Sequence, residues 1–211
     1  YYRIGCHAVM VVVEKYVHPT LIANTAASIK GRGMHWLFHR IEEDCKSHPE
    51  LTRYFLANDI EKYYDSVSQE QMRRVVRQYV CDPMLLPMID NFISILPKGL
   101  SKGLRSSQCF ANLLLSPIDH KMCALVPSYV CEGGTARYMY QRYMDDVRMR
   151  AGDKRTLWRL ADIYHSEISN LGLKVKASEA VRPLTDGDDY LGFVNFGTHS
   201  RIRKRIKRTA A

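Results

Sequence analysis

Two adjacent carboxylates, Asp145 and Asp146, follow an aromatic and an apolar residue in the tetrapeptide Tyr143-Met144-Asp145-Asp146. This pattern suits a tight β-hairpin that presents both acids to a divalent metal ion. In two-metal phosphoryl transfer, carboxylates from two separate segments share a pair of Mg²⁺ ions, which activate an attacking hydroxyl and stabilise the displaced phosphates. The tetrapeptide supplies one such segment. The competing interpretation is a polar turn with two solvated acids, so a second acidic segment has to be found.

Asp59 offers that second segment. It ends the short, aromatic-rich run Thr52 to Asp59, which reads as a strand, and Tyr64 follows five residues later. An ordinary acid at a strand end is the alternative for Asp59, and its pairing with the later Asp-Asp motif argues against that alternative.

Length and composition bound the class of protein. The 211 residues are 46% hydrophobic and can bury a core in one large or two small domains. No apolar run approaches the ~20 residues that span a bilayer, and the start lacks a signal-peptide pattern, so we expect a cytoplasmic protein without a membrane partner. The chain begins without Met, which indicates a piece of something longer. Six scattered cysteines without a Cys-x-x-Cys pair argue against a zinc site and favour reduced thiols.

Positive charge is concentrated near one end of the chain. The net charge is +9, and the segment 201–208 alone carries six positive side chains. Such a run indicates contact with phosphate backbones, with a solvated tail as the alternative.

The elements that must position these residues follow from periodicity and composition. Helices are predicted over Gly5–Tyr16, from Met34 onward, and over Gln69–Val80, Phe110–Leu125 and Thr156–Leu171. Strands are predicted over Thr52–Asp59, as a hairpin within Ala136–Met149, and over Lys174–Val181 and Tyr190–Phe196. The order strand, helix, strand pair, helix, strand predicts an α+β fold with a ferredoxin-like antiparallel sheet backed by helices.

Over nearly its whole length the chain resembles the reverse transcriptases of bacteria and phages. In that family the first palm motif has an Asp that ligates both metals, a next residue whose carbonyl helps, and an aromatic steric gate at the fifth position after the Asp. Asp59, Ile60 and Tyr64 match those positions. The resemblance implies a right-hand polymerase with fingers and palm, in which Tyr143 and Met144 lie against template or primer.

The segment Gly99–Asn112 is similar to the motif that lies against the incoming nucleotide and the template. The resemblance implies dNTP contacts for Lys102, Gly103 and Gln108 and a template contact for Ser107. The spacing is closest to the reverse transcriptases of diversity-generating retroelements, which commonly carry Tyr-Met-Asp-Asp. Residues 101–104, Ser-Lys-Gly-Leu, stand where those enzymes usually have Pro-Ile-Gly-Asn. Lys102 therefore replaces the isoleucine that is linked, in those enzymes, to mispairing at template adenines. The stretch Pro127–Arg137 resembles an insertion.

Three further motifs fit the family less closely. The turn Lys30-Gly31-Arg32-Gly33 is similar to a fingers motif whose basic side chains neutralise the triphosphate; a basic surface turn is the alternative. Lys174 and Lys176 occupy the place of the fourth palm motif, where a lysine can protonate pyrophosphate, and a solvated strand face fits them equally. The segment 188–193 resembles the primer grip, with Leu191 and Gly192 at its centre.

Taken together, the resemblance implies an RNA-templated DNA polymerase. It would add dNTPs to a primer 3′-hydroxyl with two Mg²⁺ ions, for which Mn²⁺ can substitute, held by Asp59, Ile60, Asp145 and Asp146. An RNA template, a DNA or RNA primer and an accessory protein are the expected partners. Residues 1–50 would be partial fingers, 51–198 the palm with 80–106 interleaved, and 199–211 the start of the thumb or a basic tail.

Two other functions remain open at this level. One is an antiviral-defence reverse transcriptase that is protein-primed or untemplated. The other is an inactive palm that serves as an RNA-binding assembly subunit, although the presence of all three acids and of Tyr64 counts against it.

Overall fold

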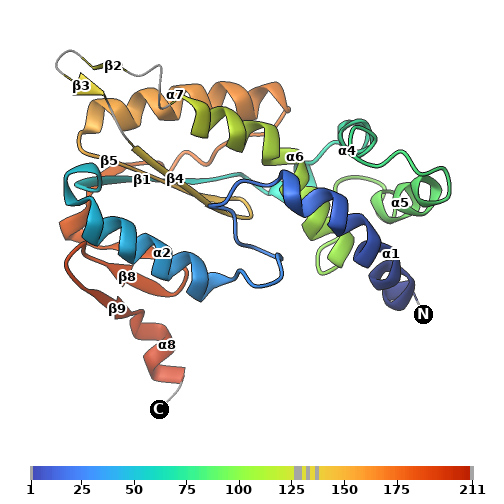
Figure 1. Cartoon of the computed structure of the whole chain (residues 1–211), viewed down its shortest axis with the longest axis horizontal. Coiled ribbons are helices and arrows are strands. Elements are labelled where there is room, and N and C mark those ends of the chain that lie inside the picture. The colour runs from blue at the N-terminus through green and yellow to red at the C-terminus, as the bar shows by residue number, and fades with distance from the viewer. Residues whose placement is uncertain (1, 126–129, 132–133, 136–137, 210–211) are drawn as a thin grey trace.

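The computed structural model of the chain describes residues 2–125, 130–131, 134–135 and 138–209, which form a mixed α+β fold (Figure 1). The helices are α1 (Tyr2–Val17), α2 (Met34–Ser47), α3 (Tyr63–Ser66), α4 (Gln69–Val76), α5 (Leu85–Ile93), α6 (Arg105–Ala124), α7 (Lys154–Asn170) and α8 (Lys204–Thr209), with short 3₁₀ turns η1 (His18–Thr20), η2 (Pro49–Leu51) and η4 (Leu184–Asp186). The strands are β1 (Tyr54–Asp59), β2 (Val130–Cys131), β3 (Gly134–Thr135), β4 (Tyr138–Tyr143), β5 (Asp146–Ala151), β6 (Val181–Pro183), β7 (Asp188–Tyr190), β8 (Phe193–Asn195) and β9 (Ser200–Ile202).

The central sheet has four antiparallel strands in the order β4-β5-β1-β6. The helices α3 to α6 connect β1 to the β4–β5 hairpin, and α7 connects that hairpin to β6. This is the split β-α-β-β-α-β arrangement that the order of elements in the sequence predicts. The ferredoxin-like antiparallel sheet is therefore confirmed.

Both faces of this sheet are covered. The helices α6 and α7 lie on one face, and α2 lies on the other together with the second sheet, β7-β8-β9 (Figure 1). Because successive side chains of a strand point to opposite faces, Leu56 of β1 joins the core under α6 and α7, whereas Phe55 packs with Leu37 and Ile41 of α2. Residues of β4 and β5 are consequently almost all buried, charged ones included.

The amino-terminal helix packs along α6. Cys6, Met10, Val13 and Val17 recur at helical spacing and are buried, and α1 ends at Val17, two residues before Pro19. The helices α1, α4 and α5 pack against α6 beside the sheet (Figure 1). The helix predicted over Gly5–Tyr16 is confirmed.

Two strand predictions are wrong. The segment Tyr190–Phe196 is not one strand but the hairpin β7–β8, because Leu191 (φ 54°) and Gly192 (φ 87°) both take the left-handed conformation that a tight hairpin turn requires. The segment Lys174–Val181 is mostly irregular, with a single bridge from Val175 to Ile60 before β6 begins at Val181. Its backbone instead bonds to the residues at the end of β1.

Smaller differences concern element ends and coverage. The helix predicted to Val80 ends at Val76, and α6 begins at Arg105, inside the predicted loop Pro97–Ser106. The predicted insertion Pro127–Arg137 falls largely outside the described residues. Five cysteines are free thiols, and the side chain of Cys131 lies outside the described part. Among the described helices, none combines the length and apolarity needed to cross a bilayer.

Candidate active site

Strand register brings the three predicted acids to one edge of the central sheet. Asp59, the last residue of β1, pairs with Asp146, the first residue of β5, and Tyr143 of β4 pairs with Asp146 from the other side. Asp145 lies in the turn between β4 and β5, and its carbonyl accepts a hydrogen bond of 3.4 Å from the Ile60 N–H. Two segments about 85 residues apart in sequence thus meet here, as the sequence analysis predicts.

The acids share an electrostatically unfavourable site that two cations relieve. Burial raises the pKa of Asp145, and the charge of Asp59 adds to this effect. Burial also raises the pKa of Asp146, although the Arg148 guanidinium opposes it at 2.5 Å. The Lys176 ammonium donates to Asp59 Oδ2 at 2.7 Å, which raises the pKa of Lys176.

The donor atoms at this edge suit Mg²⁺, which prefers hard carboxylate and carbonyl oxygens. Asp59 Oδ1 is buried and has no hydrogen-bond partner among the described residues, so it is an oxygen without a cation or donor to satisfy it. As the side chains lie, no three acidic, His or Cys groups in the described part of the chain converge on one metal position. Lys176 and Arg148 each hold one oxygen of a carboxylate at this edge, Asp59 Oδ2 and Asp146 Oδ1 respectively.

A cleft of about 720 Å³ opens beside the acids. Tyr64, Lys102, Asp145 and Lys176 are among its lining residues. The Tyr64 hydroxyl lies 3.7 Å from Met144 Sδ, and burial, with a contribution from the charge of Asp145, raises the pKa of Tyr64 to about 12. The ring is therefore neutral and fixed against the turn that carries Asp145.

The loop before α6 approaches the cleft closely. A Cβ on Gly99 (φ 72°) would come within 2.5 Å of the Tyr64 carbonyl oxygen, so only glycine allows this approach. Lys102 of the same loop pairs with Asp65 at 2.8 Å on the rim of the cleft, and Gly103 takes φ 86°.

The other predicted residues of this motif lie on α6. Gln108 Oε1 accepts a hydrogen bond of 2.9 Å from the Ser28 hydroxyl, which joins α6 to the amino-terminal segment. Ser107, the predicted template contact, is only 1% exposed, because the start of the helix turns its side chain into the core.

The basic residues predicted to bind phosphate differ in availability. Lys30 is exposed, whereas the Arg32 guanidinium donates to the carbonyls of Ile22, Ala23 and Thr25 at 3.2 to 3.3 Å. Arg32 thus closes its own loop rather than projecting freely toward a triphosphate. Lys174 lies outside the cleft, in a separate 300 Å³ pocket with other exposed lysines.

The predicted primer-grip residues lie close to the acids. Leu191 and Gly192 form the turn of the β7–β8 hairpin. The hydroxyl of Tyr190, the residue before them, donates to the Asp146 carbonyl at 3.0 Å. The structure therefore brings this hairpin and the acidic edge together.

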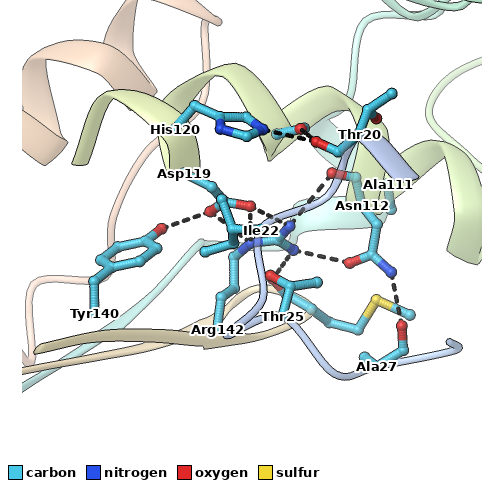
Figure 2. Close-up of polar contacts among 12 residues, drawn as sticks. Thr20, Ile22, Thr25, Ala27, Ala111, Asn112, Asp119, His120, Tyr140 and Arg142 are labelled. Atoms are coloured by element: carbon cyan, nitrogen blue, oxygen red, sulfur yellow. Dashed lines mark hydrogen bonds and ion pairs between the residues drawn. The ribbon is translucent and has the colours of Figure 1, made fainter. Parts of the chain in front are cut away.

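Sequence reasoning missed a buried cluster behind the acidic turn, which Figure 2 shows. Arg142 of β4 and Asp119 of α6 are both 0% exposed, and their side chains form an ion pair at 2.6 Å. Arg142 also donates to Asn112 Oδ1 and to the Met144 carbonyl, both at 2.9 Å, while the Tyr140 hydroxyl donates to Asp119 at 2.7 Å. The cluster fixes the turn that carries Asp145. The only signal in the sequence was a charged residue within an aromatic strand.

A second missed cluster lies on the opposite face of the sheet. Arg148 bonds to Asp146 and, through its Nε at 3.0 Å, to Asp188, which also pairs with Arg150. The sequence did carry a signal for this cluster, because Asp146, Arg148 and Arg150 occupy alternate positions and must share one face of a strand.

Neither a protein-family model nor a curated protein matches the chain. Solved structures do match it. Apo telomerase from Candida tropicalis aligns with a TM-score of 0.68 and 12% identity over 93% of this chain and 40% of its own. Telomerase from Candida albicans in complex with a TWJ fragment of telomeric RNA gives a TM-score of 0.65 and 11% identity over 94% of this chain and 37% of its own. The chain thus spans less than half the length of these structures, and the likeness concerns the fold.

Proposed function

We propose that this chain is the fingers and palm region of an RNA-templated DNA polymerase, a reverse transcriptase. The observation that carries the proposal is the meeting of Asp59, Asp145 and Asp146 at one sheet edge beside a cleft of about 720 Å³. The fold likeness to telomerases, which are relatives of reverse transcriptases, supports it. Two of the telomerase structures contain a fragment of telomeric RNA, which agrees with an RNA partner for this chain.

The residues have distinct roles in this proposal. Mg²⁺ ions, or Mn²⁺ in their place, would activate the primer 3′-hydroxyl and neutralise the triphosphate, with Asp59 and the Asp-Asp turn supplying the carboxylates. Tyr64 stands beside Asp145 in the cleft and would exclude a 2′-hydroxyl from the sugar pocket. Lys102 on the cleft rim would pair with dNTP phosphate once it leaves Asp65, and the hairpin with Leu191 and Gly192 would hold the primer end.

The retroelement subclass rests on the sequence resemblance alone. The spacing from Gly99 to Asn112 supports a diversity-generating retroelement enzyme, and the lysine at 102 argues against adenine-directed mutagenesis of the usual kind. An antiviral-defence enzyme remains the alternative, and products made with and without an RNA template distinguish the two. Only a templated enzyme yields template-complementary DNA.

The ion pairs Lys176–Asp59 and Arg148–Asp146 are the specific observation in favour of a second candidate, an inactive palm that binds RNA. Such a subunit would retain RNA affinity without nucleotide incorporation. The exposure of the Lys176–Asp59 pair makes it readily displaced, which favours the active enzyme.

Primer extension on an RNA template with dNTPs and Mg²⁺ tests the proposal. Asp145→Ala combined with Asp146→Ala should abolish incorporation and leave RNA binding largely intact, because the acidic turn serves the metal site rather than RNA. Asp162→Asn, an exposed acid on α7, is the matched control and should extend primers normally. Normal extension by the double variant would refute the polymerase assignment, and RNA binding without extension by the wild type would favour the inactive palm.

A further inference from the structure

Arg148 contacts two acids at once, Asp146 and Asp188, whereas the Lys176 side chain donates to Asp59. Its Nη1 donates to Asp146 Oδ1 at 2.5 Å and its Nε donates to Asp188 Oδ1 at 3.0 Å, so one planar guanidinium bridges two carboxylates. Its Nη2 donates to the Asp189 carbonyl at 3.3 Å, and the group lies 4.2 Å from the centre of the Tyr190 ring. All three nitrogens of the Arg148 guanidinium therefore donate to neighbouring oxygens.

Burial of the cation, not of the acid, separates this pair from the one at Asp59, because Asp146 is 40% exposed. The Arg148 side chain is 9% exposed and Asp188 is 1% exposed, whereas Lys176 and Asp59 are 46% and 42% exposed. An exposed ammonium on one carboxylate is easily exchanged for another cation, but the buried Arg148 guanidinium cannot leave without breaking its bonds to Asp146, Asp188 and the Asp189 carbonyl together. A metal ion can thus replace Lys176 but not Arg148.

We propose that Arg148 withholds Asp146 from the metal ions and fastens it to the β7–β8 hairpin, so that Asp59 and Asp145 are the metal ligands and Asp146 is a positioning residue. This inference rests on the proposed polymerase function and narrows its ligand set.

Asp146 is linked to the β7–β8 hairpin in two ways. Arg148 reaches Asp188 and Asp189 of β7 by side chain and backbone, and the Tyr190 hydroxyl donates to the Asp146 carbonyl at 3.0 Å. Asp146 is therefore held from its side chain and from its backbone by one hairpin. Because Asp145 directly precedes Asp146, the hairpin also helps to position Asp145, a metal ligand in this proposal. A primer end bound to the hairpin would therefore be held in a fixed position relative to that ligand.

Mn²⁺ binding to the 211-residue chain, measured as the loss of the free-ion paramagnetic resonance signal, tests the ligand assignment. Asp59→Asn and Asp145→Asn should each weaken Mn²⁺ affinity at least tenfold. The isosteric Asp146→Asn should change it less than threefold. Arg148→Met should tighten it several-fold by releasing a third carboxylate, whereas Arg148→Lys, which keeps the charge and loses the bridging fork, should lie closer to the wild type.

Hydrogen exchange of the hairpin amides provides the readout for positioning. Asp146→Asn and Arg148→Met should accelerate exchange in residues 188–195, and Asp59→Asn should not, because Asp59 has no bond to the hairpin among the described residues. If Arg148→Met fails to fold, Asp146→Asn still decides both readouts.

The outcomes separate this inference from the function it rests on. If the wild type binds Mn²⁺ and extends primers while Asp146→Asn loses as much affinity as Asp145→Asn, the inference is overturned and the polymerase stands. Unchanged hairpin exchange in Asp146→Asn also overturns it, as does unchanged Mn²⁺ affinity in a folded Arg148→Met. If the wild type neither binds Mn²⁺ nor extends primers, both proposals fall.

Discussion

Lys176 and Asp59 contact each other twice. The Lys176 ammonium donates to Asp59 Oδ2 at 2.7 Å, and the Lys176 backbone N–H donates to the Asp59 carbonyl at 2.9 Å. The backbone bond anchors the irregular segment beside β1, while the side chain is half exposed and can swing away. Lys176 is thus a displaceable cation on Asp59, which lies beside Asp145 and Asp146.

Removal of this lysine side chain should ease metal binding. We expect Lys176→Met to tighten Mn²⁺ binding about two- to fivefold, the range that exposed ion pairs typically contribute. Lys174→Met is the matched control, because Lys174 lies in a different pocket and should leave Mn²⁺ affinity unchanged. Isothermal titration calorimetry with Mn²⁺ measures both. Equal affinities for Lys176→Met and the wild type would show that the ammonium does not compete with metal.

The ring of Tyr64 should control the choice of sugar. Tyr64→Ala is expected to lower the kcat/KM preference for dNTPs over rNTPs by about tenfold or more, or ~1.4 kcal/mol, because the ring no longer fills the space of a 2′-hydroxyl. Tyr64→Phe retains the ring and should stay within about threefold of the wild type. Single-nucleotide extension with paired dNTP and rNTP substrates measures this preference. A sugar preference that follows the hydroxyl rather than the ring would contradict the gate.

The sequence predicted the central sheet because its strands and helices carry strong local signals. Asp59 and the Asp145-Asp146 pair could be placed on one edge, since a strand end and a hairpin tip meet there once the order of elements is known. The hairpin at Leu191 was missed because leucine rarely takes a positive φ, and because Gly192 alone fits a bulge within a strand as well as a turn. The irregular segment with Lys174 was missed because its partners lie at the end of β1, far away in sequence.

The ion pairs of Arg148 and Arg142 could not be predicted from the sequence, although the charged residues stand out within their strands. Alternation places Arg148 on the face of Asp146, but its second partner Asp188 comes from a different sheet. Arg142 pairs with Asp119, and the position of Asp119 within the helix predicted over 110–125 does not indicate a partner on β4. Such pairs depend on which elements pack on each face, and that is a tertiary property.

Asp44 should give the protein a measurable pH dependence of stability. Burial raises its pKa, although Arg40 and a 2.9 Å hydrogen bond from Gln141 oppose the shift. A raised folded pKa means that the stabilising contribution is fully present below the unfolded pKa of ~3.9 and is lost as pH rises through the folded value. Asp44→Asn, always neutral, should therefore be more stable than the wild type at pH 7.5, by about 0.5 kcal/mol.

Urea unfolding at pH 7.5 and pH 4 measures this difference, which should shrink at the lower pH. Asp162→Asn, on an exposed face of α7, is the control and should show little difference at either pH. A lower stability of Asp44→Asn at pH 7.5 would mean that the ionised carboxylate is favoured in the fold.

The fully buried pair of Arg142 and Asp119 should dominate the stability of the acidic turn (Figure 2). Arg142→Met leaves the Asp119 carboxyl group in the core with only the Tyr140 hydroxyl as a remaining side-chain donor among the described residues, so we expect a loss of about 3–5 kcal/mol. Asp119→Leu should cost a similar amount, because it strands the guanidinium. The double variant removes both charges and should lose less than either single one, leaving a coupling energy of about 2 kcal/mol or more.

Urea unfolding of the four proteins completes this double-mutant cycle. The double variant should nevertheless remain less stable than the wild type, because Asn112 Oδ1 and the Met144 carbonyl lose their donor. Loss of the bond to Met144 should also loosen the turn, so the double variant should extend primers more slowly even when it is folded. Additive single effects would show that the two charges are stabilised separately, and wild-type extension rates in the double variant would show that the turn holds Asp145 without Arg142.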